Sequence, residues 1–74
     1  MSNQSDQFTL KGREYIELNN LLKLTGQCSS GGAAKMAITH GEVKVDGVVE
    51  LRKRCKIRPG QRVSIGGYEI DIQP

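Results

Sequence analysis

The alternation of apolar and charged residues around Asp46-Gly47 constrains the fold of this chain more than any other feature. The stretch EVKVDGVVE, residues 42–50, places valines at alternate positions before the Asp-Gly pair and two more valines after it. A period of two is typical of a strand with one buried face, and Asp-Gly favours the tight turn of a two-residue hairpin. The sequence therefore predicts a β-hairpin here.

A second hairpin is predicted near the carboxyl end of the sequence. The stretch RVSIGGYEIDI, residues 62–72, has apolar residues at alternate positions on both sides of Gly66-Gly67, a pair that suits a tight turn. RPGQ at residues 58–61 predicts the preceding turn, because its proline fixes φ and its glycine can adopt positive φ. Residues 8–15, FTLKGREY, are a candidate short edge strand. We therefore expect a small, mostly antiparallel β-sheet.

Two short helices are predicted before the hairpins. In IELNNLLKLTGQ, leucines recur at helical spacing and Gly26 follows as a stop signal, which predicts a helix over about residues 17–25. In CSSGGAAKMAITHGE, Ser29 or Ser30 can cap a helix over about residues 31–40. Because few residues join the two helices, they should pack against each other and against the sheet. The predicted fold class is α+β.

The length of 74 residues limits the chain to one small domain. Residues 1–7 are polar and patternless, and they lack the basic start and apolar run of a signal peptide. We expect a disordered tail there and a single domain over residues 8–74. No stretch has the apolar length needed to span a bilayer, so we expect a soluble, cytoplasmic monomer with no membrane association.

Positive charge is concentrated in one part of the sequence. Residues 1–43 carry four Lys or Arg and four Asp or Glu, whereas residues 44–62 carry seven Lys or Arg and two Asp or Glu, a net charge of +5. Residues 63–74 add two acidic residues, which brings the total to +3. Such a cluster favours binding to a polyanion, and phosphate backbones are the commonest large one. The alternative is a basic run that only solubilises the surface.

Signals for catalysis or metal binding are weak. Cys28, Cys55 and His40 supply three nitrogen or sulfur ligands, whereas a structural zinc site usually has four. GQCSSGG begins like a phosphate-binding P-loop, but Gly32 stands where lysine is needed and Lys35 comes three positions too late. We therefore expect no metal, no cofactor and no enzymatic activity, with a cysteine-dependent enzyme as a distant alternative.

Four stretches, ELNNLLKLTG, SSGGAAKMAITHG, GEVKVDGVV and IRPGQRV, follow one another between Ile16 and Ile65. Together they resemble the S-four-like RNA-binding domain, the alpha-L module of a small-subunit ribosomal protein, pseudouridine synthases and tyrosyl-tRNA synthetases. The length and arrangement are closest to small stand-alone YbcJ-like proteins. The resemblance implies two packed helices against a small sheet, and an RNA-binding surface on the second helix and the adjoining strand and loop. The family often has arginines where this chain has Gly31 and Gly32.

The resemblance and the charge distribution together define the candidate site. Carried over position by position, the resemblance points to the second helix, to the first strand of the hairpin and to the basic residues that follow it. The predicted RNA-binding residues are Ser30, Lys35, Lys44, Arg52, Lys53, Arg54, Lys56, Arg58 and Arg62, of which Lys53 and Arg62 are secondary.

Residues 51–57 would be half core and half charge if they were extended. Alternation would then place Leu51, Cys55 and Ile57 inward. Arg52, Arg54 and Lys56 would point outward, and Lys53 marks a bulge or loop. Cys55 is therefore expected to be a packing residue that holds the basic row in place.

The class of partner follows from the side chains in this cluster. No aromatic residue interrupts the basic run, so base stacking is not expected there. Phosphate contact with structured RNA, ribosomal or tRNA-like, fits better. The strongest alternative is a protein-interaction adaptor whose basic face binds an acidic partner, such as a ribosome-associated or RNA-modifying protein.

Overall fold

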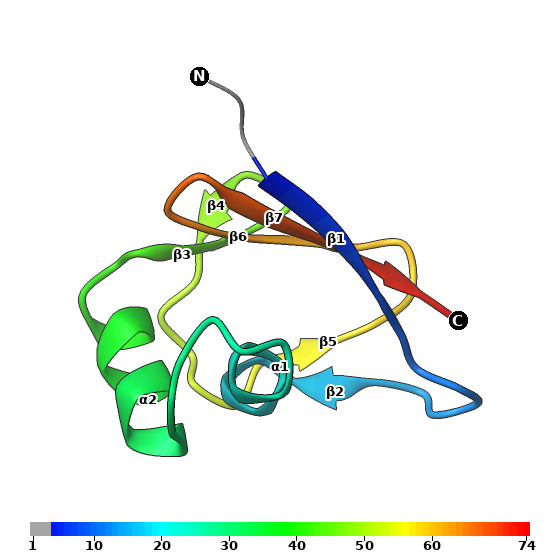
Figure 1. Ribbon diagram of the computed structural model, residues 1–74, viewed down its shortest axis with the longest axis horizontal. Coiled ribbons are helices and arrows are strands. Elements are labelled where there is room, and N and C mark those ends of the chain that lie inside the picture. Colours follow the sequence, from blue (N-terminus) through cyan, green and yellow to red (C-terminus); the bar gives the residue numbers. More distant parts are fainter. Residues whose placement is uncertain (1–3) are drawn as a thin grey trace.

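The computed structural model describes residues 4–74, with two helices on one side of a five-stranded sheet (Figure 1). The strands are β1 (Gln4–Thr9), β2 (Ile16–Glu17), β3 (Val43–Val45), β4 (Val48–Val49), β5 (Lys56–Ile57), β6 (Arg62–Ile65) and β7 (Tyr68–Gln73), and the helices are α1 (Leu18–Leu24) and α2 (Gly31–Thr39). The large sheet has the order β1-β7-β6-β3-β4, and β2 and β5 form a separate two-stranded sheet. The predicted α+β class is confirmed.

Both predicted hairpins are present. β3 and β4 pair in antiparallel fashion, and their turn holds Asp46 at φ 53° and Gly47 at φ 85°. A two-residue hairpin turn requires two successive positive φ values if its twist is to match that of the flanking strands. This requirement explains the Asp-Gly pair. β6 and β7 pair around Gly66, which also has positive φ. β3 pairs with β6 as well, so the two hairpins form one continuous sheet.

The amino-terminal strand corrects two expectations. Residues 4–7 belong to β1 rather than to a disordered tail, and residues 1–3 lie outside the described part of the chain. The predicted edge strand over residues 8–15 is right only at its start, because β1 ends at Thr9. β1 runs parallel to β7 at the edge of the sheet. The polar sequence of β1 gave no sign of a strand. An edge strand can be held by backbone hydrogen bonds and needs no alternating apolar pattern.

Both helices lie within a residue of their predicted bounds. Ser30 caps α2, because its Oγ accepts a hydrogen bond from the Ala33 N–H at 3.1 Å. At the other end, His40 is the C-cap, and Gly41 follows with φ 76°. α1 begins one residue later than predicted, because Glu17 belongs to β2. α1 and α2 pack against each other, as expected from their short connection.

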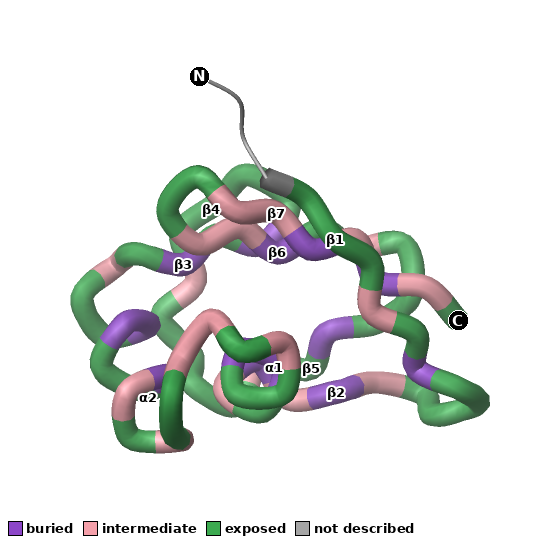
Figure 2. The backbone as a smooth tube through the Cα atoms, viewed as in Figure 1, coloured by how far each residue is buried: buried purple, intermediate pink, exposed green. Residues whose placement is uncertain are grey.

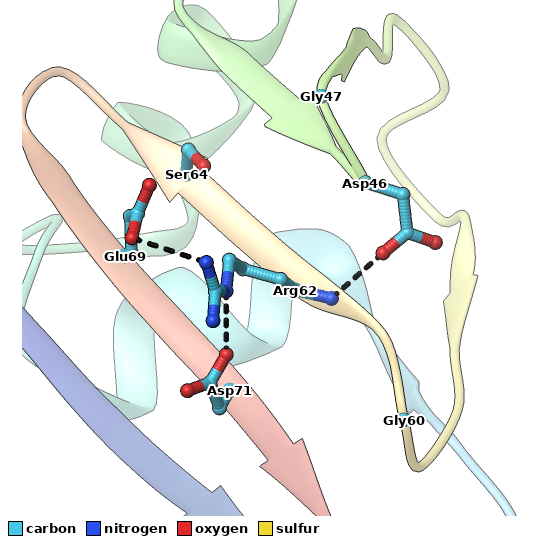
Figure 3. A pocket seen from close by; sticks show the side chains of 7 residues that line it. All are labelled: Asp46, Gly47, Gly60, Arg62, Ser64, Glu69 and Asp71. Atoms are coloured by element: carbon cyan, nitrogen blue, oxygen red, sulfur yellow. Dashed lines mark hydrogen bonds and ion pairs between the residues drawn. The ribbon is translucent and has the colours of Figure 1, made fainter.

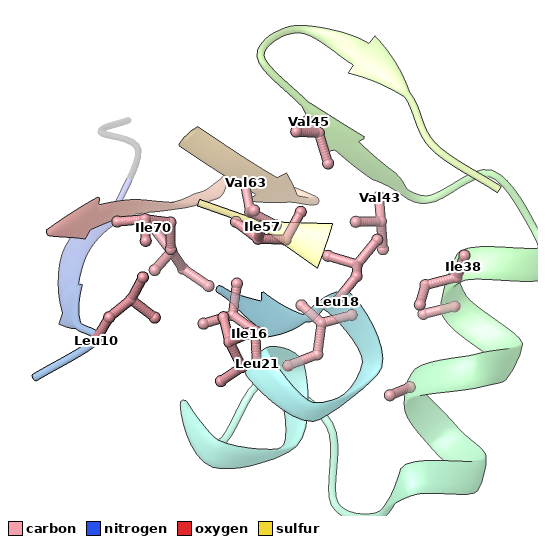
Figure 4. Close-up of a cluster of buried hydrophobic side chains, with 14 residues drawn as sticks. Leu10, Ile16, Leu18, Leu21, Ile38, Val43, Val45, Ile57, Val63 and Ile70 are labelled. Atoms are coloured by element: carbon pink, nitrogen blue, oxygen red, sulfur yellow. The ribbon is translucent and has the colours of Figure 1, made fainter. Parts of the chain in front are cut away.

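The hydrophobic core lies between the large sheet and the two helices (Figure 2). Leucines of α1, Ile38 of α2 and the inward residues of β3, β6 and β7 converge there (Figure 4). Ile16 and Ile57 are paired across the two-stranded sheet and point into the same core. None of the helices in residues 4–74 is long and apolar enough to cross a membrane.

Truncation of Ile57 tests whether packing of its side chain in the core holds β5 in place. Ile57 is fully buried, so Ile57→Ala should lower the free energy of unfolding by about 2–5 kcal/mol. Val48→Ala is the control, because Val48 is 69% exposed and its truncation should change stability by no more than about 0.5 kcal/mol. Urea unfolding followed by circular dichroism measures both. Equal stabilities of the two variants would contradict this packing.

Candidate nucleic-acid interface

The segment 52–58, here called the basic segment, is anchored by its backbone to the start of α1. The Leu18 N–H donates a hydrogen bond to the Cys55 carbonyl at 2.9 Å, and the Asn19 N–H donates to the Lys53 carbonyl at 3.1 Å. Glu17, the N-cap residue, makes no side-chain cap. The basic segment therefore satisfies helix amides that a capping side chain would otherwise bind, and its own position is fixed in return.

The alternation predicted for residues 51–57 holds only in part. Cys55 packs against the core and Ile57 is buried, as expected. Leu51 is 59% exposed, which contradicts its predicted inward position. The cause is a turn at Lys53 and Arg54, closed by a hydrogen bond from the Cys55 N–H to the Arg52 carbonyl at 3.2 Å. This turn, expected at Lys53 as a bulge or loop, resets the alternation before β5.

The outer face of the two-stranded sheet brings charge and an aromatic ring together. Glu17 is paired with Lys56, and the same antiparallel register continued by one residue places Tyr15 opposite Arg58. The Lys56 Nζ lies 5.1 Å from the centre of the Tyr15 ring, and the Arg58 Cζ lies 6.0 Å from it. No aromatic residue interrupts the basic run along the sequence, but the fold brings the Tyr15 ring beside Lys56 and Arg58 from another segment.

Glu17 connects this outer face to the two helices. Its carboxylate lies 3.7 Å from the Arg54 Nε, in an exposed ion pair. It also borders an open depression between α1 and α2, whose other lining residues are Asn19, Asn20, Lys23, Gly31 and Lys35. Lys35 is thus brought near Lys23, a residue that the sequence analysis left out. The polar positions of α1 opposite its leucines were the available signal for it.

A second open depression lies beside the first. It is lined by Arg52, Arg54, Cys55 and Lys56. Since Arg54 borders this depression and also pairs with Glu17, the two depressions adjoin. We define the basic face as the cations that line the two depressions together with the remaining cations of the basic segment, Lys53 and Arg58. Its members are Lys23, Lys35, Arg52, Lys53, Arg54, Lys56 and Arg58.

Arg52 forms an ion pair with Glu50 of the same chain. Its Nε lies 2.9 Å from Glu50 Oε2, and its backbone N–H donates to the same oxygen at 2.9 Å. The hydrogen bonds from the Arg52 side chain and backbone lower the pKa of Glu50 from 4.5 to about 2. Glu50 therefore stays ionised far below neutral pH and remains paired with Arg52.

Lys44 and Arg62 do not lie on the basic face. Both project from the outer side of the large sheet, since the neighbours Val43, Val45 and Val63 point into the core. The Arg62 side chain is held by two carboxylates, with its Nε 2.7 Å from Asp71 Oδ1 and its Nη1 3.5 Å from Glu69 Oε1 (Figure 3). Its backbone N–H donates to Asp46.

The structure thus separates the predicted residues into groups. Lys35 and the basic segment share one surface, Lys44 and Arg62 lie on another, and Ser30 acts as a helix cap. Sequence reasoning could not separate them, because the acidic partners of Arg62 lie on the neighbouring strand.

The two cysteines are free and half-buried. Burial raises the pKa of the Cys28 thiol, and the negative charge of Glu42 raises it further. Burial likewise raises the pKa of Cys55, with a contribution from Glu50. Neither environment favours the thiolate that a nucleophile needs. Among residues 4–74, no group of three or more His, Cys, Asp or Glu side chains is arranged to hold a metal ion.

The Glu50–Arg52 pair predicts a pH dependence of stability. Because the pKa of Glu50 is lower in the folded chain, its contribution is complete above pH 4.5 and is lost as the pH falls towards 2. Glu50→Gln should therefore be less stable than the parent at about pH 6, and the difference should disappear at about pH 2. Urea unfolding across this range measures the difference. A gap of constant size would show that Glu50 acts through packing rather than charge.

Comparison with known proteins places this geometry in a family. The model for the S4 domain matches residues 8–73. YbcJ of Escherichia coli (strain K12) is 52% identical over 65 residues, which cover 88% of this chain and 93% of that protein, and YbcJ of Shigella flexneri gives the same figures. The solution structure of E. coli YbcJ superposes with a TM-score of 0.74 at 50% identity, covering 100% of this chain and 92% of that one. The chain belongs to the S4 domain family.

Proposed function

We propose that this protein is a non-catalytic RNA-binding module that contacts the phosphates of structured RNA, ribosomal or tRNA-like, through the basic face. The observation that carries the proposal is the joining of the basic segment to the outer surface of α1 and α2 around Glu17. Family membership supports it, and the solution structure of E. coli YbcJ is described as revealing an alpha-L motif involved in RNA binding.

The proposed mode of contact is electrostatic. Lysine and arginine side chains on adjoining open depressions can follow a phosphate backbone without enclosing it. Structured RNA is recognised largely by shape and by its phosphates, because its deep groove is too narrow for side chains to read. A small rigid surface with cations on two helices and one loop is suited to that task.

The residues proposed for phosphate contact differ from those expected from sequence. Lys35, Arg54, Lys56 and Arg58 remain, and Lys23 joins them. Arg52 and Lys53 are assigned supporting roles at the edge of the surface. We assign Lys44 and Arg62 no direct contact, because they lie on the outer side of the large sheet. We further propose a single domain acting as a monomer in the cytoplasm, where both classes of RNA are found.

A matched pair of single substitutions tests the location of the site. Lys56→Gln and Lys44→Gln each remove one cation from an exposed strand position, but only Lys56 lies on the basic face. Lys56→Gln should weaken binding to a structured RNA hairpin and lower the slope of log affinity against log salt by roughly one, while Lys44→Gln leaves both unchanged. Fluorescence anisotropy across a salt series measures them.

The combined neutralisation of Arg54, Lys56 and Arg58 extends this test to the whole surface. Binding should fall further and the slope should decrease by roughly two to three. A flat salt response of the unmodified chain would reject the proposal and favour the adaptor alternative. Equal effects of Lys44→Gln and Lys56→Gln would reject the assignment to the basic face.

Removal of the Glu17 charge should strengthen binding. Glu17 is an acidic group within the basic face, 3.7 Å from the Arg54 Nε and paired with Lys56 in the strand register. Glu17→Gln releases Arg54 and lowers the repulsion of phosphate, so RNA affinity should rise roughly twofold to fivefold at low salt. The gain should shrink as salt increases. Glu14→Gln, in the exposed loop before β2, is the control. No gain in affinity by Glu17→Gln over Glu14→Gln would contradict RNA binding at this surface.

A further inference from the structure

Tyr15 has surroundings unlike those of the other two aromatic residues. Phe8 and Tyr68 both pack against the core, although the Arg13 Cζ also lies 5.9 Å from the centre of the Phe8 ring, and the Tyr68 hydroxyl donates a hydrogen bond to Asp6. Tyr15 is half-buried on the outer face of the two-stranded sheet. Its ring contacts the cations of Lys56 and Arg58 rather than apolar core residues. The position of this ring is therefore not accounted for by core packing.

We propose that Tyr15 is a stacking site for one unpaired nucleobase adjoining the structured RNA, with Lys56 and Arg58 contacting the phosphates on either side of that nucleotide. The inference rests on the proposed function and adds a second class of contact to it. Because every base has a flat π face, the site would accept an unpaired nucleotide with little regard to its identity.

The two cations make an exchange on the ring favourable. An exposed cation–π contact is weaker than the stacking of a base on an aromatic side chain. A base that displaced Lys56 and Arg58 from the ring would gain about as much as the loss of both contacts costs, and pairing of the released cations with phosphate would make the exchange favourable. The released cations lie within reach of the same nucleotide, because both are within 6.0 Å of the ring centre. The phosphate charge would then replace the π electrons as their partner.

The backbone around Tyr15 is suited to hold the ring in place. Tyr15 directly precedes Ile16, which is buried and paired with Ile57. Alternation along β2 turns Tyr15 and Glu17 to the outer face while Ile16 points into the core. The ring is thus on the residue directly before a strand that is fixed to the core, so little ordering is needed when a base stacks.

The test compares two RNA ligands with two variants. One ligand is a blunt hairpin, and the other is the same hairpin with a short single-stranded tail. Tyr15→Leu keeps apolar bulk but removes the flat ring, whereas Tyr15→Phe keeps the ring. The tail should strengthen binding by the parent and by Tyr15→Phe roughly five- to a hundredfold, and it should add little in Tyr15→Leu.

Tyrosine emission gives a second measurement. The chain has two tyrosines and no tryptophan, so in Tyr68→Phe all tyrosine emission comes from Tyr15. The tailed hairpin should quench this emission, and the blunt hairpin should quench it less. Circular dichroism of each variant confirms that the fold is retained.

The outcomes separate this inference from the proposed function. A tail that strengthens binding equally in Tyr15→Leu and in the parent would overturn the stacking site alone. Equal loss of affinity for both ligands in Tyr15→Leu would also overturn it, because Tyr15 would then only position Lys56 and Arg58. Absence of salt-dependent binding of either hairpin to the parent chain would overturn the proposed function, and the inference with it.

Discussion

The hydrogen bonds from the first amides of α1 to the carbonyls of Lys53 and Cys55 are the contact on which the rest of the site depends. α1 has 7 residues, fewer than an isolated helix needs to be stable in water. With no side-chain cap at Glu17, its start is held by the basic segment. The helix and the segment therefore stabilise each other.

The same contact determines which side chains are exposed. It brings the chain after the first hairpin alongside β2, where Ile57 pairs with Ile16 and both enter the core. The alternation of a strand then leaves Tyr15, Glu17 and Lys56 on the outside. Burial of Ile16 and Ile57 thus causes the charged side chains to point outward, away from the core.

The features that could be predicted from the sequence are those encoded by neighbouring residues. The Asp46-Gly47 turn and the Ser30 cap are local, so both were predictable with their physical reasons. Pairing between distant segments was not. β2 and β5 have two residues each, too few for a periodic pattern, and β1 joins β7 from the opposite end of the chain.

The candidate site shows the same division. Charge along the sequence located the basic segment, but it could not show that Arg62 is held by acids on β7 or that Tyr15 lies beside Lys56. Leu51 was misplaced because one turn resets the alternation. For Arg62 and Tyr15, a contact across the fold that local spacing does not encode determined the outcome, whereas Leu51 depended on a local turn that the alternation alone does not reveal.

The clustering of carboxylates around Arg62 on the outer side of the large sheet also bears on how the molecule meets a polyanion. A modest net charge of +3 is distributed so that most cations gather around the helices and β5, while on the sheet Asp46, Glu69 and Asp71 outnumber Lys44 and Arg62. The molecule therefore carries an electric dipole. In the field of a polyanion such a dipole experiences a torque, so the chain turns its helical side forward before contact. Orientation, more than total charge, would then determine how many encounters are productive.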